Sequence, residues 1–159
     1  MEGNTLENLI NKEKYQVFIL TCPAYIPFSF ARHPWFVLNK KGLLSRWEVR
    51  HYKNVSNKDL GYIHLNAQPP FQGVNISFFI KKHFWKSKLT GYIEGDENST
   101  AHKIIKLIEN SEKVYPYCYK YFFFGPNSNT YIQWVLDNFP DFNIQLPWNF
   151  IGKGFKIRK

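Results

Sequence analysis

The sequence has 159 residues, of which 44% are hydrophobic and 19% aromatic, and this suits one domain whose core contains many packed rings. The formal net charge of +9 favours partners that carry negative charge, such as nucleic acid, anionic lipid or acidic peptide. The longest N-terminal apolar run, residues 17–20, is too short for a signal sequence or a membrane span. With only two cysteines and no metal-ligand spacing, we expect a soluble cytoplasmic protein without a metal or cofactor.

Strand patterns dominate the first two thirds of the chain. Residues 1–14 are interpreted as a polar N-terminal segment and residues 15–159 as a single globular domain. Alternating or apolar runs bounded by Gly and Pro predict strands, and Gly42 marks a hairpin turn between two of them. The predicted strands span residues 15–21, 35–38, 46–50, 62–65, 75–80 and 89–93.

Helical patterns appear only later. Apolar residues at three- and four-residue steps follow the capping sequence at 96–99 and predict a helix that ends near Lys113. Residues 117–124 alternate as a strand would, and a second helix is predicted from residue 131 until Pro140 ends it. The fold class is therefore α+β, a small antiparallel sheet packed with two main helices.

The sequence Gly125-Pro126-Asn127-Ser128-Asn129-Thr130 leads directly into this second helix. A hydroxyl at a helix start lies near free backbone N–H groups and the positive end of the helix dipole, which favours Ser128 as a nucleophile. The alternative is that Asn127, Ser128 or Asn129 only caps the helix, because these residue types are preferred caps.

His33 precedes a predicted strand and is the best candidate for a general base; the alternative is a structural histidine bonded to backbone. Glu48 and His51, near the next strand, are candidates for the group that orients it. Because side chains alternate faces along a strand, only one of the two shares a face with His33 unless a bulge intervenes.

Other candidates carry weaker signals. Lysines at residues 81–88 are interleaved with aromatic residues, and a second basic cluster covers 153–159; each is either an anion-binding surface or a solvated segment. Gly152-Lys153 lacks the rest of a phosphate-binding P-loop, which excludes nucleotide hydrolysis of that type. Cys118 is an alternative nucleophile or a buried thiol.

Five short segments together resemble a bacterial domain family of unknown function over residues 15–155. They are Ala31-Arg32-His33-Pro34-Trp35, Arg46-Trp47-Glu48-Val49, the Gly-Pro-Asn-Ser-Asn-Thr sequence at 125–130, Leu146-Pro147 and Ile151-Gly152-Lys153. More distantly, their order is similar to that of the circularly permuted papain-like hydrolases, which include NlpC-type peptidases and lecithin:retinol acyltransferase-like enzymes. This resemblance implies a papain-like architecture.

The distant resemblance also implies roles for particular residues. His33 matches the base, Glu48 or His51 the polar third member, and Ser128 the position where that group has a cysteine. The implied activity is hydrolysis or acyl transfer on an amide or ester of a small molecule, peptide or lipid. The expected substrate-binding residues are Arg32, Trp35, Arg46, Asn127, Asn129 and Thr130. The alternative function is a non-catalytic module that binds an anionic partner.

Overall fold

The computed structural model describes residues 6–156, and its centre is a five-stranded antiparallel sheet in the order β4-β3-β2-β1-β5. The strands are β1 (Tyr15–Pro23), β2 (Arg32–Lys40), β3 (Leu43–Val49), β4 (Ile63–Leu65) and β5 (Lys88–Gly95). The α+β class and the antiparallel sheet predicted from the sequence are confirmed.

The predicted hairpin joins β2 to β3. Lys40 pairs with Leu43, and the two connecting residues, Lys41 and Gly42, have φ angles of 53° and 96°. Two consecutive left-handed residues give a tight turn whose twist matches that of the strands. At the other end of the sheet, β2 begins at Arg32 and His33, which pair with Pro23 and Cys22 of β1.

Both faces of the central strands are buried. Along β1, Val17 and Ile19 face the core shared with the helices, whereas Phe18 and Leu20 face a second core formed with the loops and the N-terminal segment. This alternation is the two-residue period of a strand. It also explains the nearly continuous apolar sequence of β1, because a strand covered on both sides needs apolar residues at every position.

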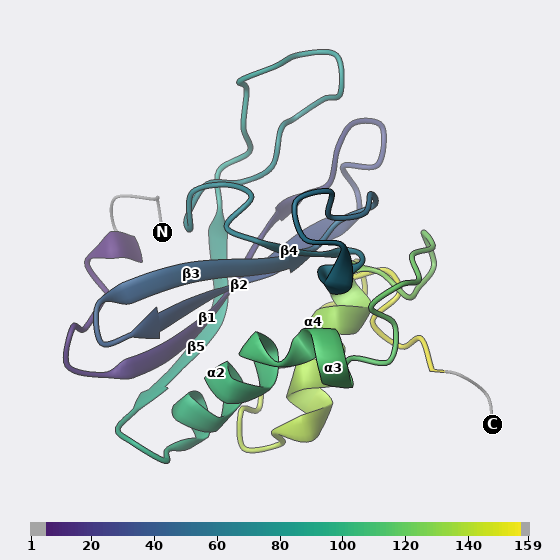
Figure 1. Cartoon of the computed structure of the whole chain (residues 1–159). Helices are drawn as coiled ribbons and strands as arrows, with labels where there is room; N and C mark the ends of the chain where they lie inside the picture. Colours follow the sequence, from purple (N-terminus) through teal and green to yellow (C-terminus); the bar gives the residue numbers. More distant parts are fainter. Residues whose placement is uncertain (1–5, 157–159) are drawn as a thin grey trace.

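The helices lie together on one face of the sheet (Figure 1). They are α2 (Thr100–Glu109), α3 (Ser111–Val114) and α4 (Ser128–Asn138), and a short 3₁₀ helix, η1 (Lys58–Leu60), precedes β4. The predicted first helix is confirmed but ends at Glu109, and α3 follows as a separate turn after Asn110. The Ser99 side chain caps α2 by accepting a hydrogen bond from the backbone N–H of His102.

Two predicted strands do not form. Residues 75–80 lie in a long loop that pairs only at the isolated bridge between Asn75 and Phe84. Residues 117–124 form turns and irregular backbone; the carbonyl of Cys118 accepts a hydrogen bond from the N–H of Tyr62, but β4, the edge strand that follows, is only three residues long and offers little length for pairing. The aromatic content of both segments suits a strand, but a strand also needs a neighbouring strand for its hydrogen bonds.

The N-terminal segment is partly packed on the domain. Leu6 is fully buried in the second core, and the Gln16 side chain donates a hydrogen bond to the carbonyl of Leu9. Residues 1–5 of the predicted polar segment and 157–159 of the basic tail lie outside the described residues. Over residues 6–156, none of the helices has the length and apolar character needed to cross a membrane.

Candidate functional site

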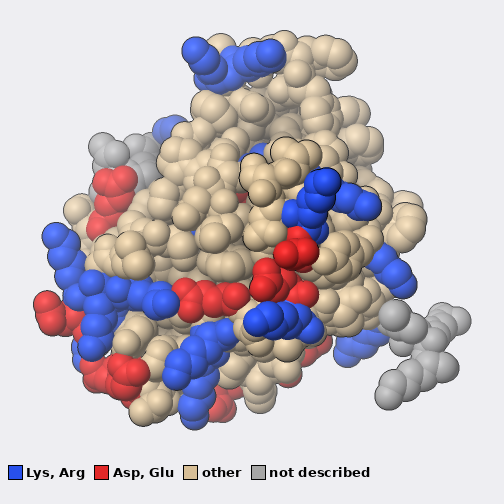
Figure 2. All heavy atoms as spheres, in the orientation of Figure 1, with Lys and Arg blue, Asp and Glu red and all other residues tan. Residues whose placement is uncertain are grey.

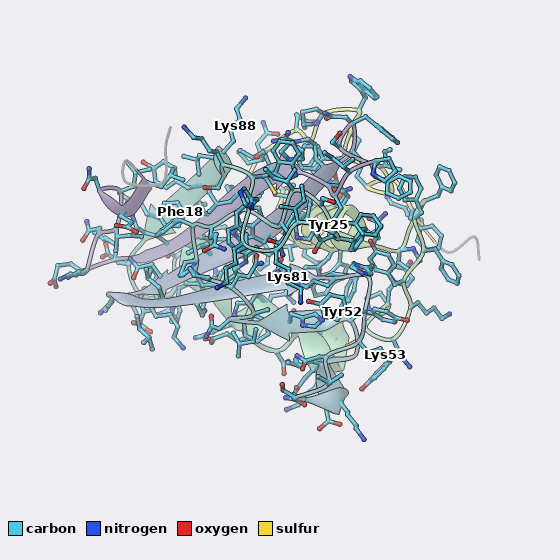
Figure 3. The ribbon with its side chains drawn as sticks, turned by 90° about the horizontal axis from the view of Figure 1, so that it is seen from above. Phe18, Tyr25, Tyr52, Lys53, Lys81 and Lys88 are labelled. Carbon is cyan, nitrogen blue, oxygen red and sulfur yellow. The ribbon has the colours of Figure 1, made fainter. Side chains whose placement is uncertain are left out.

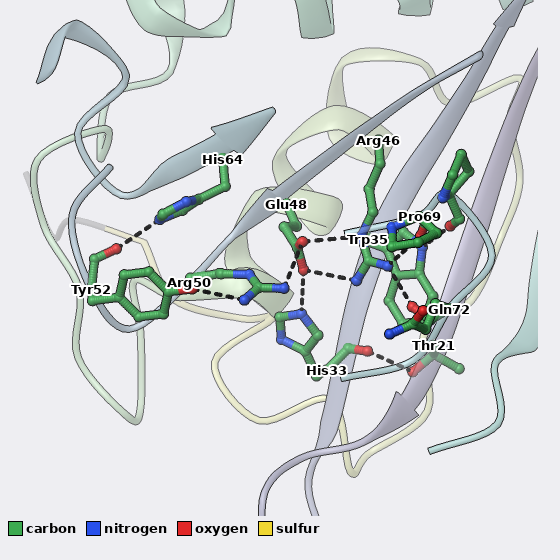
Figure 4. A network of polar contacts seen from close by, with 11 residues as sticks. Thr21, His33, Trp35, Arg46, Glu48, Arg50, Tyr52, His64, Pro69 and Gln72 are labelled. Carbon is green, nitrogen blue, oxygen red and sulfur yellow. Dashed lines mark hydrogen bonds and ion pairs between the residues drawn. The ribbon is translucent and has the colours of Figure 1, made fainter. Parts of the chain in front are cut away.

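The site is built around Glu48, whose side chain is completely buried. Arg46, Glu48 and Arg50 alternate along β3 and its continuation, so their side chains project from the same face. Glu48 accepts hydrogen bonds from Arg46 Nη2 at 3.1 Å and Arg50 Nη2 at 3.0 Å, and its Oε2 lies 2.9 Å from Nε2 of His33 (Figure 4). One carboxylate therefore joins the ends of two strands.

These contacts fix the charge of Glu48. Burial alone raises the pKa of a carboxyl group, but the His33 hydrogen bond and the two guanidinium groups outweigh that effect, so the pKa of Glu48 lies well below its ordinary range. Glu48 is ionised at neutral pH. Because two arginines pair with this one carboxylate, the group of buried charges next to His33 has a net positive charge.

Arg46 and Trp35 pack on the side of this network that faces away from the pocket. The Arg46 guanidinium lies 4.2 Å from the centre of the Trp35 ring and donates hydrogen bonds to the carbonyls of Pro69 and Gln72. Trp35 Nε1 donates to the carbonyl of Pro70 at 2.8 Å. The sequence predicted that Arg46 and Trp35 bind substrate, but both are fully buried and neither lines the pocket.

The surroundings of His33 favour its neutral form. Burial lowers its pKa, and the charges of Arg46 and Arg50 add to this effect, although Glu48 acts in the opposite direction. Because Nε2 contacts Glu48, the other ring nitrogen, Nδ1, remains to face a reacting group. No hydrogen bond among residues 6–156 uses Nδ1.

Of the two candidates for the orienting group, Glu48 contacts His33 and His51 does not. The Oε2 atom of Glu48 lies 2.9 Å from Nε2 of His33. His51 follows the end of β3, and its ring packs edge-on against Tyr25 and Phe78, with centroids 5.7 and 5.6 Å apart. His51 is thus a wall residue of the same pocket.

The opposite wall is the loop that begins α4. Asn127 is the N-cap: its side chain accepts hydrogen bonds from the backbone N–H groups of Asn129 and Thr130, and Thr130 Oγ1 accepts from the Asn127 N–H in a capping box. Ser128 is therefore the first helical residue and not the cap. No hydrogen bond within the described part of the chain uses its hydroxyl or its backbone N–H.

The C-terminal segment holds this loop in place. Asn127 Nδ2 and Asn129 Nδ2 donate to the carbonyl of Ile151 at 3.0 and 2.8 Å, and Thr130 Oγ1 donates to the carbonyl of Gly152 at 2.7 Å. Asn129 Nδ2 also lies 3.2 Å from the carbonyl oxygen of Arg32 at the start of β2. Two of the sequence segments singled out above, at 125–130 and 151–153, are thus bonded to each other.

A pocket of about 250 Å³ separates the two walls. It brings together six of the ten predicted site residues: Arg32, His33, His51, Asn127, Ser128 and Asn129. Sequence reasoning missed its aromatic wall, because nothing in the pattern of these residues indicates that they share a cavity. That wall consists of Tyr25, Phe28, Phe78, Tyr121 and Phe123.

Neither cysteine lies in the pocket. Cys22 and Cys118 are free and buried, and burial raises the pKa of both thiols, that of Cys22 to about 11. Cys118 donates a hydrogen bond to the carbonyl of Leu60, which is the environment of a structural thiol. Within residues 6–156, no cluster of three or more His, Cys, Asp or Glu side chains is arranged to hold a metal ion.

The fold and the pocket define an α+β protein with a His-Glu pair facing a helix N-terminus across a partly aromatic pocket. The chain belongs to the family of proteins of unknown function DUF3750, whose family model matches residues 13–155. Comparison with curated proteins and with solved structures gave no match.

Proposed function

We propose that the pocket is the active site of a serine hydrolase or acyltransferase acting on an amide or ester. The observation that carries this proposal is the pairing of His33 with an ionised Glu48 on one wall and the unbonded Ser128 hydroxyl on the other. A serine needs a base, an orienting group and oxyanion donors before it becomes reactive. This pocket contains a candidate for each.

The reaction follows from these groups. Ser128 Oγ attacks the carbonyl carbon, and its proton passes to Nδ1 of His33, while Glu48 stabilises the imidazolium that forms. The free N–H of Ser128 and the N-terminal end of α4 stabilise the oxyanion. The C–N or C–O bond then breaks, and the leaving group takes the proton from His33, which leaves an ester on Ser128.

The acyl group leaves in a second step. Water, or an acceptor alcohol or amine, attacks the ester and gives its proton to His33, and the bond between the acyl carbon and Ser128 Oγ breaks as His33 passes this proton to Oγ. The acceptor decides between hydrolysis and acyl transfer. The circularly permuted papain-like group uses cysteine where this chain has Ser128, so membership of that group is part of the proposal.

The walls indicate the kind of substrate. Their aromatic side chains suit an apolar acyl group. Arg32 lies on the same wall as His33, and within residues 6–156 no carboxylate lies within ion-pair distance of it. An acidic group on the substrate would supply the missing counterion, whereas Arg46 is already occupied by Glu48.

Covalent labelling tests this proposal. The protein is incubated with a fluorophosphonate, which reacts with activated serines, and with a chloroacetamide, which reacts with thiols, and each adduct is read by intact mass. We expect fluorophosphonate labelling of the wild type, loss of labelling in Ser128→Ala, and a rate at least about 10²-fold lower in His33→Gln. Gln retains a donor for Glu48 but cannot take a proton.

Controls separate reactivity from folding. Ser56→Ala, in an exposed loop, and Cys118→Ala should label as the wild type does. Ser128→Cys should gain a chloroacetamide adduct that the wild type, with two buried thiols, lacks. Fluorophosphonate labelling that persists in Ser128→Ala would overturn the assignment. Complete absence of labelling from a wild-type protein that is folded, as shown by cooperative unfolding, would overturn it too.

A non-catalytic module for an anionic partner is the second candidate, favoured by the net charge of +9 and by the four lysines within residues 81–88. On that hypothesis, Ser128→Ala leaves function intact. Replacing Lys81, Lys82, Lys86 and Lys88 with Gln instead weakens a salt-sensitive interaction. The two candidates therefore predict opposite responses to the same pair of variants.

A further inference from the structure

Three segments, residues 24–32, 76–88 and 121–128, surround the pocket. In each segment, exposed apolar side chains are close in the sequence to a phenylalanine that lines the pocket. Phe28, Phe78 and Phe123 line the pocket. Their neighbours project into solvent, and Phe79 is 95% exposed. We call the exposed neighbours the apolar rim: Ile26, Phe30, Phe79, Ile80, Phe122 and Phe124.

The three segments form one continuous surface. Phe28 and Phe123 lie with ring centroids 5.2 Å apart, and Tyr25 stacks on Phe78 at 4.4 Å. The backbone N–H of Ile26 donates to the carbonyl of Ile76 at 2.9 Å, which ties the first segment to the second. The three segments are therefore in contact with one another, and the rim residues lie next to the pocket-lining residues in the sequence.

The charge of this surface has one sign. Residues 24–32, 76–88 and 121–128 contain no Asp or Glu, whereas Lys81 and Lys82 follow Ile80 directly. Figure 2 shows basic side chains at the tip of the loop that rises at the top of the view, above a broad area that is mostly uncharged. Figure 3 looks onto this side of the molecule, with Tyr25 and Lys81 labelled.

We propose that the apolar rim and its lysines dock on an anionic lipid bilayer. Exposed Phe and Ile side chains gain free energy by entering the boundary of the acyl chains, and lysines beside them reach anionic headgroups. A nucleic acid would use the charge but not Ile26 or Ile80, which have no ring on which a base can stack. Docking in this orientation places the pocket mouth at the bilayer surface.

Vesicle sedimentation with the full chain tests the proposal. Vesicles of phosphatidylcholine alone are compared with vesicles that contain 30% phosphatidylglycerol, at about 100 mM salt. We expect binding to the anionic vesicles and little to the neutral ones. Phe79→Ser/Ile80→Ser and Lys81→Gln/Lys82→Gln should each weaken that binding on the order of tenfold or more.

Matched variants on other surfaces serve as controls. Leu43→Ser removes an apolar side chain that is 70% exposed, at the opposite end of β2 from His33. Lys103→Gln/Lys106→Gln removes two exposed charges from α2. Both controls should bind as the wild type does, and the rim variants should unfold at the wild-type midpoint because their side chains are exposed.

The outcomes are distinct. Failure to bind anionic vesicles even at low salt, binding that the rim variants leave unchanged, or binding to single-stranded DNA but not to vesicles would overturn the proposal. Docking does not depend on Ser128 chemistry, so Ser128→Ala should bind vesicles normally. A wild type that binds anionic vesicles but is not labelled by the fluorophosphonate would therefore count against the active site alone.

Discussion

The side chain of Asn127 fills the space that a Cβ atom on Gly152 would need. An added Cβ would lie 2.4 Å from Asn127 Nδ2, and Gly152 has a φ of 91°. Both the absent side chain and the left-handed backbone are therefore required where the C-terminal segment meets the start of α4. This contact fixes the wall of the pocket that carries Ser128.

Gly152→Ala should consequently destabilise the protein by about 1–3 kcal/mol, because the new methyl group must displace the helix cap and the backbone conformation disfavours an L side chain. Gly154→Ala is the matched control, since nothing lies within 4 Å of a Cβ at that position. Urea unfolding of the two variants checks the prediction. Equal midpoints would contradict it.

Asn127 and Ser128 should respond differently to replacement by alanine. Asn127→Ala removes the side chain that caps α4 and bonds to Ile151, and we expect a loss of about 1–2 kcal/mol. Ser128→Ala removes a hydroxyl without a hydrogen bond among residues 6–156 and should change stability by less than about 0.5 kcal/mol. Thermal unfolding of both variants measures the difference, and a larger loss in Ser128→Ala would contradict this prediction.

Glu48→Gln should be strongly destabilising. It leaves the buried guanidinium groups of Arg46 and Arg50 without a counterion, which typically costs about 3–5 kcal/mol. Glu109→Gln breaks a partly exposed ion pair with Lys40 and should cost less than about 1 kcal/mol. Equilibrium unfolding in urea compares the two, and similar losses would contradict the central role of Glu48.

His33 should make stability depend on pH. Because its pKa is lower in the folded protein than in the unfolded chain, the unfolded chain binds more protons as pH falls below about 6.5, and stability decreases in that direction. Glu48 adds a further loss below about pH 4.5, since its pKa is also lowered on folding.

Comparison with His33→Gln isolates the histidine from the other titrating groups. The variant should lose less stability than the wild type between pH 7 and pH 5, measured as unfolding midpoints in urea. Fluorophosphonate labelling of the wild type should persist at pH 6.5, where folded His33 is still largely neutral, and decline at lower pH. Labelling lost well above pH 6.5 would contradict a neutral base with a lowered pKa.

Local patterns predicted much of the fold. The two-residue alternation of β1 and the β2–β3 hairpin could be read from the sequence because strand period and turn residues are short-range properties. The same holds for the caps and periodicity of α2 and α4. Residues 75–80 and 117–124 have equally good strand composition, but pairing with a neighbour is a long-range property, and neither segment joins the five-stranded sheet.

By itself, the sequence determined the β2–β3 hairpin and the helix α4, and it selected His33, Glu48 and Ser128 by residue type. Only the tertiary structure decided that Glu48, and not His51, contacts His33, and that Asn127, and not Ser128 or Asn129, caps α4, because each depends on a contact of a few ångströms. The tertiary structure also buries Arg46, so that it does not line the pocket. The five residues of the aromatic wall come from three segments that are far apart in the sequence, and no local pattern predicts that these segments are in contact.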